Sequence, residues 1–560
     1  MEGKRTIISR RNFLAGAGLA AVGAAAAGIT GCSPANGTEQ KANAESAAAG
    51  NSGNTVGSGH WSWSVPPEPV ADADVSETVD CEILVIGLGS AGLTATVYAA
   101  AMGADVVTFN AASTAEAEGA YCGAYNTKYD EENGIVYDAA ALRKDYAVQG
   151  AGSNNGEVTG TIWDRSGNAI DWFAEYCKDV WAYECGPDSV IDEGIHEREH
   201  ATHMVYVWPD PEETQEQKRV YNGFTKFVQV AADKAESDGA RIYYSTPAQQ
   251  LIVNDDGSIA GAYGLKSDGT YVKANASKGV LMATGDFHHN DEMIEAFLPI
   301  MKGDLQTRNP YNTAQGDGLK MAMWAGIPLE TGPYCIGLCW PHDFTFDEYS
   351  PSKWGLIPFL RVNIAGVRYT NENLDDEWYS TSILCLADVK QPDHTGYQIC
   401  DSKYGELVDA ELFEECVEKG VIFKADSLEE LAEKVGFLDT AQFVETVERY
   451  NENCKNGYDA DFGVESEFLA HTSITEPPFY CMKRPVLKQW ANGGLQTNKF
   501  GQVLNAEWKP VGGLYAAGNV RAGLCGTHYL WKSFGSNKLN AMTGGMLAVK
   551  HMLGTWDEEF

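Results

Sequence analysis

Residues 87–92 read Gly-Leu-Gly-Ser-Ala-Gly, a spacing that suits a turn holding a chain of phosphates. Gly87 permits a tight turn, Gly89 lets the backbone approach a pyrophosphate, and Gly92 lets the following helix lie close to the preceding strand. The start of that helix adds unpaired N–H groups and a partial positive charge. The pattern predicts a dinucleotide-binding turn, and a glycine-rich turn without a ligand is the alternative.

The segments around this turn predict the elements that position it. Residues 81–86 form a short continuous apolar run, typical of a strand buried on both faces. A helix is predicted over residues 93–102 and a second strand over residues 105–109, which completes a strand–turn–helix–strand unit. The second strand ends at Asn110, where such units place an acid that holds a ribose.

The N-terminal residues predict export. Ser9-Arg10-Arg11-Asn12-Phe13-Leu14 is a twin-arginine pattern, and an apolar run over residues 13–29 follows it. Ile29-Thr30-Gly31-Cys32 resembles a lipobox, so we expect lipid attachment at Cys32 in the cell envelope. A transmembrane anchor is the alternative, although this run is short for a bilayer. Residues 33–77 should form a flexible tether followed by a proline-rich arm with two tryptophans.

Composition excludes some classes of protein. The chain has 560 residues, enough for two or three domains, and its formal net charge is -37, which argues against a nucleic-acid partner. Its 13 cysteines include no C-x-x-C spacing, so the usual zinc-ribbon, ferredoxin and c-type haem patterns are absent and no metal site is predicted. Cys335 and Cys339 form the closest pair, for which buried core thiols are the favoured interpretation.

Three further segments identify a family resemblance. They are 279–287 (GVLMATGDF), 312–318 (NTAQGDG) and 493–520, which contains GLYAAGNV. With the glycine turn, they resemble the FAD-binding flavoproteins of the fumarate reductase/succinate dehydrogenase type, which include ketosteroid dehydrogenases, urocanate reductases and cardiac glycoside reductase-like members.

The resemblance implies an α/β fold with a discontinuous Rossmann-like FAD-binding domain, residues 78–295 and 482–560. An inserted α+β capping domain, residues 296–481, would cover the flavin. Because no FMN or haem module is visible, we expect electrons to come from a separate donor, a cytochrome or a quinol-linked protein. The cofactor-binding residues that the resemblance implies, beyond Gly87, Gly89 and Gly92, are Ser90, Ala91, Asn110, Ala111, Ala248, Ala283, Thr284, Gly285, Asp317, Gly518, Asn519, Ser536 and Asn537.

The expected substrate residues depart from the family pattern. The segment from Asn363 to Glu372 resembles the family's N-x-x-G-x-R-F-x-N-E, with Tyr369 at the phenylalanine, but Asp376 occupies the position of the proton-donating arginine. Trp490 occupies the position of the substrate-gripping histidine, and residues 527–537 hold no arginine to pair a second carboxylate. Since each lost arginine contact costs on the order of 1.5–3 kcal/mol, a dicarboxylate substrate is disfavoured.

Aromatic residues stand in these segments instead, and they favour a flat, mostly neutral acceptor such as an enone, unsaturated lactone, steroid or phenylpropanoid. For each aromatic residue, ordinary core packing is the alternative. The candidates for protonating the substrate or polarising its carbonyl are Tyr334, Tyr529 and Lys532. The candidates for substrate binding are Trp340, Arg361, Trp490, His528 and Trp531.

Three functions fit these residues. The first is an exported FAD-dependent reductase that uses a small organic molecule as electron acceptor in anaerobic respiration. The second is a dehydrogenase of ketosteroid type, and the third is a lipid-anchored electron-relay or binding protein without catalysis.

Asn110 supports a prediction about cofactor affinity. An amide keeps one acceptor for a ribose hydroxyl where an acid offers two, and no Arg or Lys occurs before Lys128 to pair the phosphate of NADP. We therefore expect noncovalent FAD, bound about 1–3 kcal/mol more weakly than with an acid. Asn110→Glu should tighten FAD binding in an equilibrium titration; unchanged or weaker binding would contradict this account of the ribose contact.

Overall fold

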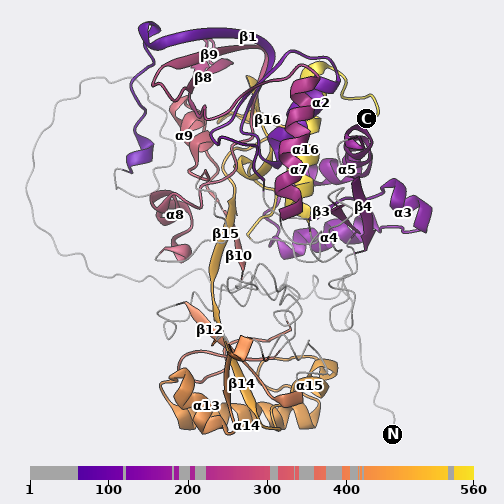
Figure 1. Ribbon diagram of the computed structural model, residues 1–560, viewed down its shortest axis with the longest axis vertical. Helices are drawn as coiled ribbons and strands as arrows, with labels where there is room; N and C mark the ends of the chain where they lie inside the picture. Colours follow the sequence, from indigo (N-terminus) through magenta and orange to yellow (C-terminus); the bar gives the residue numbers. More distant parts are fainter. Residues whose placement is uncertain are drawn as a thin grey trace, which may run out of the picture. The chain divides into compact units, whose positions relative to one another are not determined.

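The computed structural model describes residues 61–117, 121–179, 182–187, 202–207, 222–302, 313–332, 334–339, 359–373, 394–403, 414, 416–418, 420, 422–527 and 535–560 (Figure 1). The export segment and the tether up to residue 60 lie outside these residues. Five predicted site residues also lie outside them, namely Trp340, His528, Tyr529, Trp531 and Lys532.

The main sheet has eight strands and a largely parallel centre. Its principal path runs β16 (Gln502–Leu504), β17 (Pro510–Ala516), β9 (Tyr271–Met282), β1 (Val75–Ile86), β2 (Val106–Phe109) and β6 (Arg241–Tyr243). The neighbours from β17 to β6 pair in parallel, whereas β16 is antiparallel to β17. Two further antiparallel strands, β7 (Ala248–Val253) and β8 (Ile259–Leu265), extend from the N-terminal half of β9.

Alternate residues of β1 pack into two different hydrophobic cores. Ile83 and Val85 belong to one core, and Leu84 and Ile86 belong to the other. Since successive side chains of a strand point to opposite faces, the sheet is covered on both faces, as the continuous apolar run predicts. The strand is longer than predicted, because its first half, with alternating exposure, pairs with β9 from Val75 onward.

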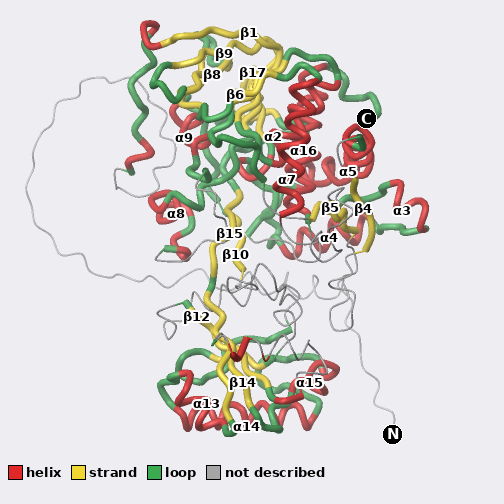
Figure 2. Tube along the Cα trace, in the orientation of Figure 1, coloured by secondary structure: helices red, strands yellow, loops and turns green. Residues whose placement is uncertain are grey.

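Small residues let helices pack closely over one face of this sheet. The helix α2 (Ser90–Ala101) contacts both α16 (Ser536–Leu553) and α7 (Asn222–Ser237), and α16 also contacts α5 (Gly156–Cys177) (Figures 1 and 2). Ten residues of α2 are buried, from Ala91 to Ala100, so this helix is enclosed on all sides. It begins three residues before the predicted start because the glycine turn itself enters the first helical turn.

Other elements lie outside the main sheet. A three-stranded sheet contains β3 (Tyr121–Gly123), β5 (Thr202–Val207) and β4 (Ala182–Pro187), and β10 (Cys335–Cys339) pairs with β15 (Leu487–Asn492). The short helices in the first 330 residues are η1 (Ser62–Ser64), η2 (Asp72–Asp74), α3 (Lys128–Asn133), α4 (Ala139–Gln149), α8 (Asp291–Phe297), η3 (Pro299–Met301) and α9 (Asp317–Trp324).

A separate hydrophobic core lies in the region predicted to cap the flavin. Its antiparallel sheet has the order β11 (Leu360–Val362), β12 (Thr395–Cys400), β14 (Phe479–Pro485) and β13 (Ile422–Ala425). The helices α13 (Leu428–Val435), α14 (Thr440–Asn456) and α15 (Ser466–Thr472) contribute most of the remaining core residues. This mixture of helices with an antiparallel sheet agrees with the predicted α+β class, while the exact domain boundaries stay a prediction.

The tryptophan arm packs on the body. Trp63 is buried, its ring lies 5.3 Å from that of Phe297, and Trp61 stacks on it at 6.3 Å. Trp324 Nε1 donates to the carbonyl oxygen of Trp63 at 3.1 Å. Residues 61–64 are therefore part of the hydrophobic core that also covers the end of β9.

Among the cysteines whose side chains the structure describes, all but Cys454 are buried. Cys335 is 1% exposed within a core, which confirms the packing interpretation for that residue. No helix in the described ranges is both long and apolar enough to cross a membrane.

Candidate functional site

The C-terminal ends of three neighbouring parallel strands define the candidate site. β1 leads into the glycine turn, β9 leads into the A-T-G segment, and β17 leads into the A-G-N segment with η5 (Gly518–Val520). In open α/β sheets, ligands bind outside the carboxyl ends of such strands. The three motifs that the sequence singled out therefore meet at one edge of the sheet.

The glycine turn has the geometry that its sequence predicts. Gly87 has φ +99°, and a Cβ at Gly92 would lie 2.8 Å from the carbonyl carbon of Gly87 and closer still to its oxygen. Gly89 is the N-cap of α2 and provides no side-chain hydrogen bond, so the first amides of the helix, at Ser90 and Ala91, have no cap. An uncapped helix N-terminus at this position is suited to a pyrophosphate.

The start of α16 offers further polar groups for a cofactor. Its N-cap, Gly535, has φ +74° and gives no side-chain cap. Four buried side-chain oxygens on this helix have no hydrogen-bond partner among the described residues: Ser536 Oγ, Asn537 Oδ1, Asn540 Oδ1 and Thr543 Oγ1. Buried polar atoms normally have partners, so this cluster fits a bound polar cofactor. Ser536 and Asn537 are among the predicted FAD-binding residues.

Asn110 lies at the end of β2, and its side chain is used differently from the acid it replaces. Asn110 Nδ2 donates to the carbonyl oxygens of Ala112 and Thr114, at 3.1 and 2.8 Å. Its Oδ1 is left as an acceptor for a ribose hydroxyl. A glutamate at position 110 could accept hydrogen bonds but could not donate them, and its negative charge would face the carbonyl oxygens of Ala112 and Thr114. The loss of these two bonds would therefore oppose the gain in FAD affinity that is predicted for Asn110→Glu.

The remaining predicted cofactor residues fall into two groups. Ala283, Thr284, Gly285 and Gly518 follow β9 and β17 at the candidate edge. Gly285 has φ +71° with open space around it, and a Cβ at Gly518 would lie 3.2 Å from that of Ala91, so the β17 loop adjoins the start of α2. The second group is more peripheral: Ala111 is exposed, Ala248 is buried at the start of β7, and Asp317 forms an ion pair with Lys320 at 2.6 Å.

Asp286 and His288 are buried polar residues that the sequence analysis did not identify. His288 Nδ1 lies 2.6 Å from Asp286 Oδ1, and Asn519 Nδ2 donates to Asp286 Oδ2 at 3.1 Å. Burial opposes ionisation, but the charge and hydrogen bonds of His288 lower the pKa of Asp286. Asn519, a predicted FAD residue, thus joins the loop after β17 to the loop after β9. The signal in the sequence was an acid and a histidine directly after the A-T-G segment.

Tyr334 is buried by aromatic residues. Its ring lies 4.7 Å from Phe297 and 5.7 Å from Phe287, and its hydroxyl donates to the carbonyl oxygen of Glu330 at 3.0 Å. Burial, with a contribution from Glu330, raises the pKa of this phenol well above its usual range. These contacts favour core packing over the predicted proton-donor role, because the hydroxyl proton is already bonded to the backbone.

The other described candidates lie on two strands. Arg361 is 1% exposed on β11, where its backbone N–H donates to Glu372 Oε1 at 3.1 Å. Glu372 also binds Arg368, which makes two further bonds to Asp459, at 2.9 and 2.7 Å. The family-like segment 363–372 is therefore held by a buried ion cluster.

Trp490 is partly buried on β15, where it pairs with Gly337 of β10 and packs against a hydrophobic core. The indole therefore has a packing role in this core. Asp376, which occupies the position of the expected arginine, lies outside the described residues. No group of three or more His, Cys, Asp or Glu side chains within the described ranges could hold a metal ion.

Glu330 is a third polar residue that the sequence did not point to. Its Oε1 accepts from the N–H of Gly494 at 2.8 Å, and its own N–H donates to the Gly494 carbonyl oxygen at 2.7 Å. Gly493 and Gly494 have φ of +138° and +134°, and a Cβ on Gly493 would overlap the carboxylate. Burial raises the pKa of Glu330 to about 7, although the bond from Gly494 opposes the shift. This carboxyl fastens the segment after α9 to the glycine pair after β15.

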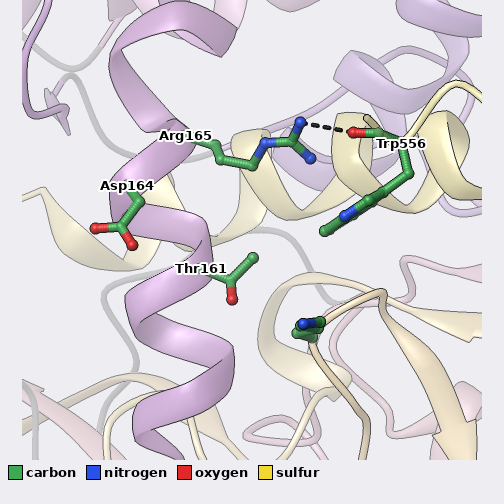
Figure 3. Close-up of a pocket in the computed structure, with 5 residues that line it drawn as sticks. Thr161, Asp164, Arg165 and Trp556 are labelled. Atoms are coloured by element: carbon green, nitrogen blue, oxygen red, sulfur yellow. Dashed lines mark hydrogen bonds between the residues drawn. The ribbon is translucent and has the colours of Figure 1, made fainter. Parts of the chain in front are cut away.

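A pocket elsewhere on the chain is lined by Thr161, Asp164, Arg165, Lys499 and Trp556 (Figure 3). Arg165 Nη2 donates to the Trp556 carbonyl oxygen at 2.6 Å, and the guanidinium lies 4.5 Å from the indole centroid. None of the predicted site residues lines this pocket. Arg165 instead connects the C-terminal segment to α5 through these contacts.

The contact between Gly92 and Gly87 generates a prediction. Gly92→Ala should lower the free energy of unfolding by about 1–3 kcal/mol and abolish retention of the predicted FAD, because the new methyl separates α2 from the turn. Gly156→Ala is the matched control, since that glycine also begins a helix but has no atom within 4 Å of its Cβ position. Thermal unfolding and flavin absorbance would measure both effects. Equal FAD content in the two variants would contradict the assigned role of Gly92.

Glu330 generates a prediction about pH. Because folding raises its pKa from 4.5 to about 7, the folded state binds the extra proton, and the associated stability is lost as pH rises through this window. Glu330→Gln keeps an acceptor for Gly494 and should gain about 2 kcal/mol over the parent protein between pH 5 and 8, allowing for partial exposure. Chemical denaturation at several pH values would measure it, with the exposed Glu467→Gln as control. A stability difference that does not change with pH would refute it.

Comparison with known proteins identifies the family. The FAD binding domain family matches residues 82–533. A probable fumarate reductase of Shewanella frigidimarina is 26% identical over 86% of this chain and 76% of its own length. A digoxin reductase of Eggerthella lenta is 27% identical over 92% of both chains. Some relatives are longer: the chain spans 38% of an NADH:acrylate oxidoreductase of Vibrio harveyi.

A solved structure has the same fold. The 3-ketosteroid-Δ4-(5α)-dehydrogenase of Rhodococcus jostii in complex with 4-androstene-3,17-dione matches with a TM-score of 0.65 and 22% identity, over 86% of this chain and 99% of that one. This likeness confirms the predicted α/β class, and the family match confirms FAD as the cofactor that the uncapped helix and the buried polar atoms fit. The chain belongs to the FAD binding domain family and is an FAD-dependent oxidoreductase acting on CH–CH groups.

Proposed function

We propose that this enzyme reduces an activated C=C bond of a flat, mostly neutral organic acceptor, such as an enone, unsaturated lactone, steroid or phenylpropanoid. The observation that carries the proposal is the replacement of the residues that hold and protonate a dicarboxylate. Trp490 occupies the position of the substrate-gripping histidine, Asp376 occupies that of the proton-donating arginine, and residues 527–537 contain no arginine. Similarity to a digoxin reductase and to a vinyl phenol reductase of Lactiplantibacillus plantarum supports this class of acceptor.

The chemistry divides between the cofactor and the chain. Bound FAD supplies the hydride when it is reduced. The chain must bind the acceptor, exclude water and deliver a proton to the carbon next to the one that receives hydride. Tyr529 and Lys532 remain the proposed proton donors or carbonyl contacts, with Trp340, His528 and Trp531 as proposed binding residues. Tyr334 is the weakest of the candidates because its hydroxyl is bonded to Glu330.

We also propose that the enzyme works outside the cytoplasm. The twin-arginine pattern and the lipobox-like sequence ending at Cys32 support export and a lipid anchor as its link to the membrane. Export on this route carries folded proteins, which suits a chain that holds FAD. A cytochrome or quinol-linked protein would supply electrons in anaerobic respiration, and the small-molecule acceptor would receive them.

An anaerobic acceptor screen tests the proposed reaction. FAD-loaded protein would be mixed with reduced methyl viologen and either a neutral enone, an unsaturated lactone, a steroid enone, a vinyl phenol or fumarate. We expect at least one neutral acceptor to be reduced roughly tenfold or more faster than fumarate, because the bidentate carboxylate contacts are absent. Fumarate as the best acceptor would refute the proposal.

The same assay distinguishes the alternatives. Desaturation of a saturated ketosteroid by an oxidising dye, without viologen oxidation by any enone, would identify a dehydrogenase. No turnover in either direction would identify an electron-relay protein. As a matched pair, Trp490→Ala should raise the KM for the neutral acceptor, whereas Trp508→Ala should not, since Trp508 is 70% exposed on a hairpin loop.

A further inference from the structure

The loop between β9 and α8 contains a buried acid and a buried imidazole. Asp286 is 4% exposed and His288 is 1% exposed. Asp286 Oδ1 accepts from the backbone N–H of His288 at 2.9 Å and lies 2.6 Å from His288 Nδ1. Asp286 Oδ2 accepts from Asn519 Nδ2 at 3.1 Å. Both carboxylate oxygens are therefore in use, and the imidazole ring is fixed through one of its nitrogens.

The second ring nitrogen of His288 is buried and unused. His288 Nε2 has no hydrogen-bond partner among the described residues. A buried polar atom without a partner is costly, so a partner from outside the chain would stabilise it. Because Nδ1 is engaged with the Asp286 carboxylate, Nε2 is the ring atom left to hydrogen-bond a polar group on that partner.

The position of the pair indicates what this partner is. Asp286 directly follows Gly285, which has open space around its Cβ position. Its other neighbour, Asn519, belongs to the loop after β17, where Gly518 adjoins the start of α2. The pair thus lies where the cofactor-binding motifs at the ends of β9 and β17 meet. FAD carries ribose and ribityl hydroxyl groups, which can both donate and accept such a hydrogen bond.

We propose that His288 Nε2 forms a hydrogen bond with a hydroxyl group of bound FAD, and that Asp286 and Asn519 position the ring for this contact. Asp286 holds the tautomer and orientation of His288, and Asn519 holds Asp286. In this arrangement, Asp286 supplies a carboxylate and Asn519 supplies an amide at the place where the loops after β9 and β17 meet. The inference depends on FAD binding and is independent of the acceptor that the enzyme reduces.

Two substitutions of His288 separate the roles of its two nitrogens. In His288→Asn, the side-chain amide can replace Nδ1 and keep the bond to Asp286, but nothing replaces Nε2. In His288→Gln, the longer side chain can replace Nε2, but Asp286 loses its imidazole partner. The full-length protein would be used throughout, with FAD affinity measured by equilibrium dialysis and stability measured by melting with and without added FAD.

We expect opposite patterns from the two variants. His288→Asn should bind FAD roughly tenfold more weakly, while its melting temperature without FAD stays equal to that of the parent or rises. His288→Gln should keep FAD affinity within about threefold, while its melting temperature without FAD falls. Parent-like FAD affinity in His288→Asn would overturn the proposal and assign Nε2 to a buried water or to packing alone.

A double-mutant cycle tests whether Asp286 acts through His288. Asp286→Asn alone should weaken FAD binding and shift the flavin absorption band. In the His288→Asn background, the same substitution should add little further loss of affinity, because the contact it positions is already gone. Independent, additive losses from the two substitutions would contradict the positioning role. His471→Ala, on the exposed surface of α15, is the control for loss of a histidine.

Discussion

The approach of α2 to the end of β1 is the constraint on which the cofactor site depends. A side chain at residue 92 would collide with the backbone of Gly87, one at residue 87 would collide with the backbone of Ala283, and Gly545 lets α16 approach α2 in the same way. Such contacts bring the N-terminal amides of α2, which have no side-chain cap, to the carboxyl edge of the sheet. The Ala-rich composition of α2 is then a packing requirement, because the helix is enclosed by other elements.

The local pattern of the sequence was sufficient to predict this part of the fold. The continuous apolar run of β1 predicted a strand covered on both faces, and the glycine spacing predicted the turn and the following helix. The sequence did not predict β7 and β8, the two antiparallel strands added to β9, because their segments carry no distinctive motif. The predicted helix began too late because glycine and serine, poor helix formers in isolation, are held in the first turn by the tight packing around them.

The polar part of the site was harder to predict, because its contacts join residues that are far apart in the chain. Asn519 and Asp286 are 233 positions apart, and Glu330 and Gly494 are 164 positions apart. A single sequence contains no signal for such pairs. The same limit applies to Tyr334, whose phenol was a reasonable catalytic candidate by residue type and whose hydrogen bond to the backbone became evident only in three dimensions. Asn110 was predicted only in part. The motif predicted an acceptor for the ribose, but it did not predict the two hydrogen bonds from the side chain to the next loop.

The tryptophan arm has a mechanical consequence. Residues 61–64 are anchored in the core shared with Phe297 and Trp324, and η1 contacts both α8 and α9. A force applied to the chain ahead of residue 61 would therefore be borne first by the indole of Trp63 and its aromatic neighbours. The long strand β1, which begins only at Val75, would be shielded from that load. The packed arm would therefore separate β1 mechanically from the chain ahead of residue 61.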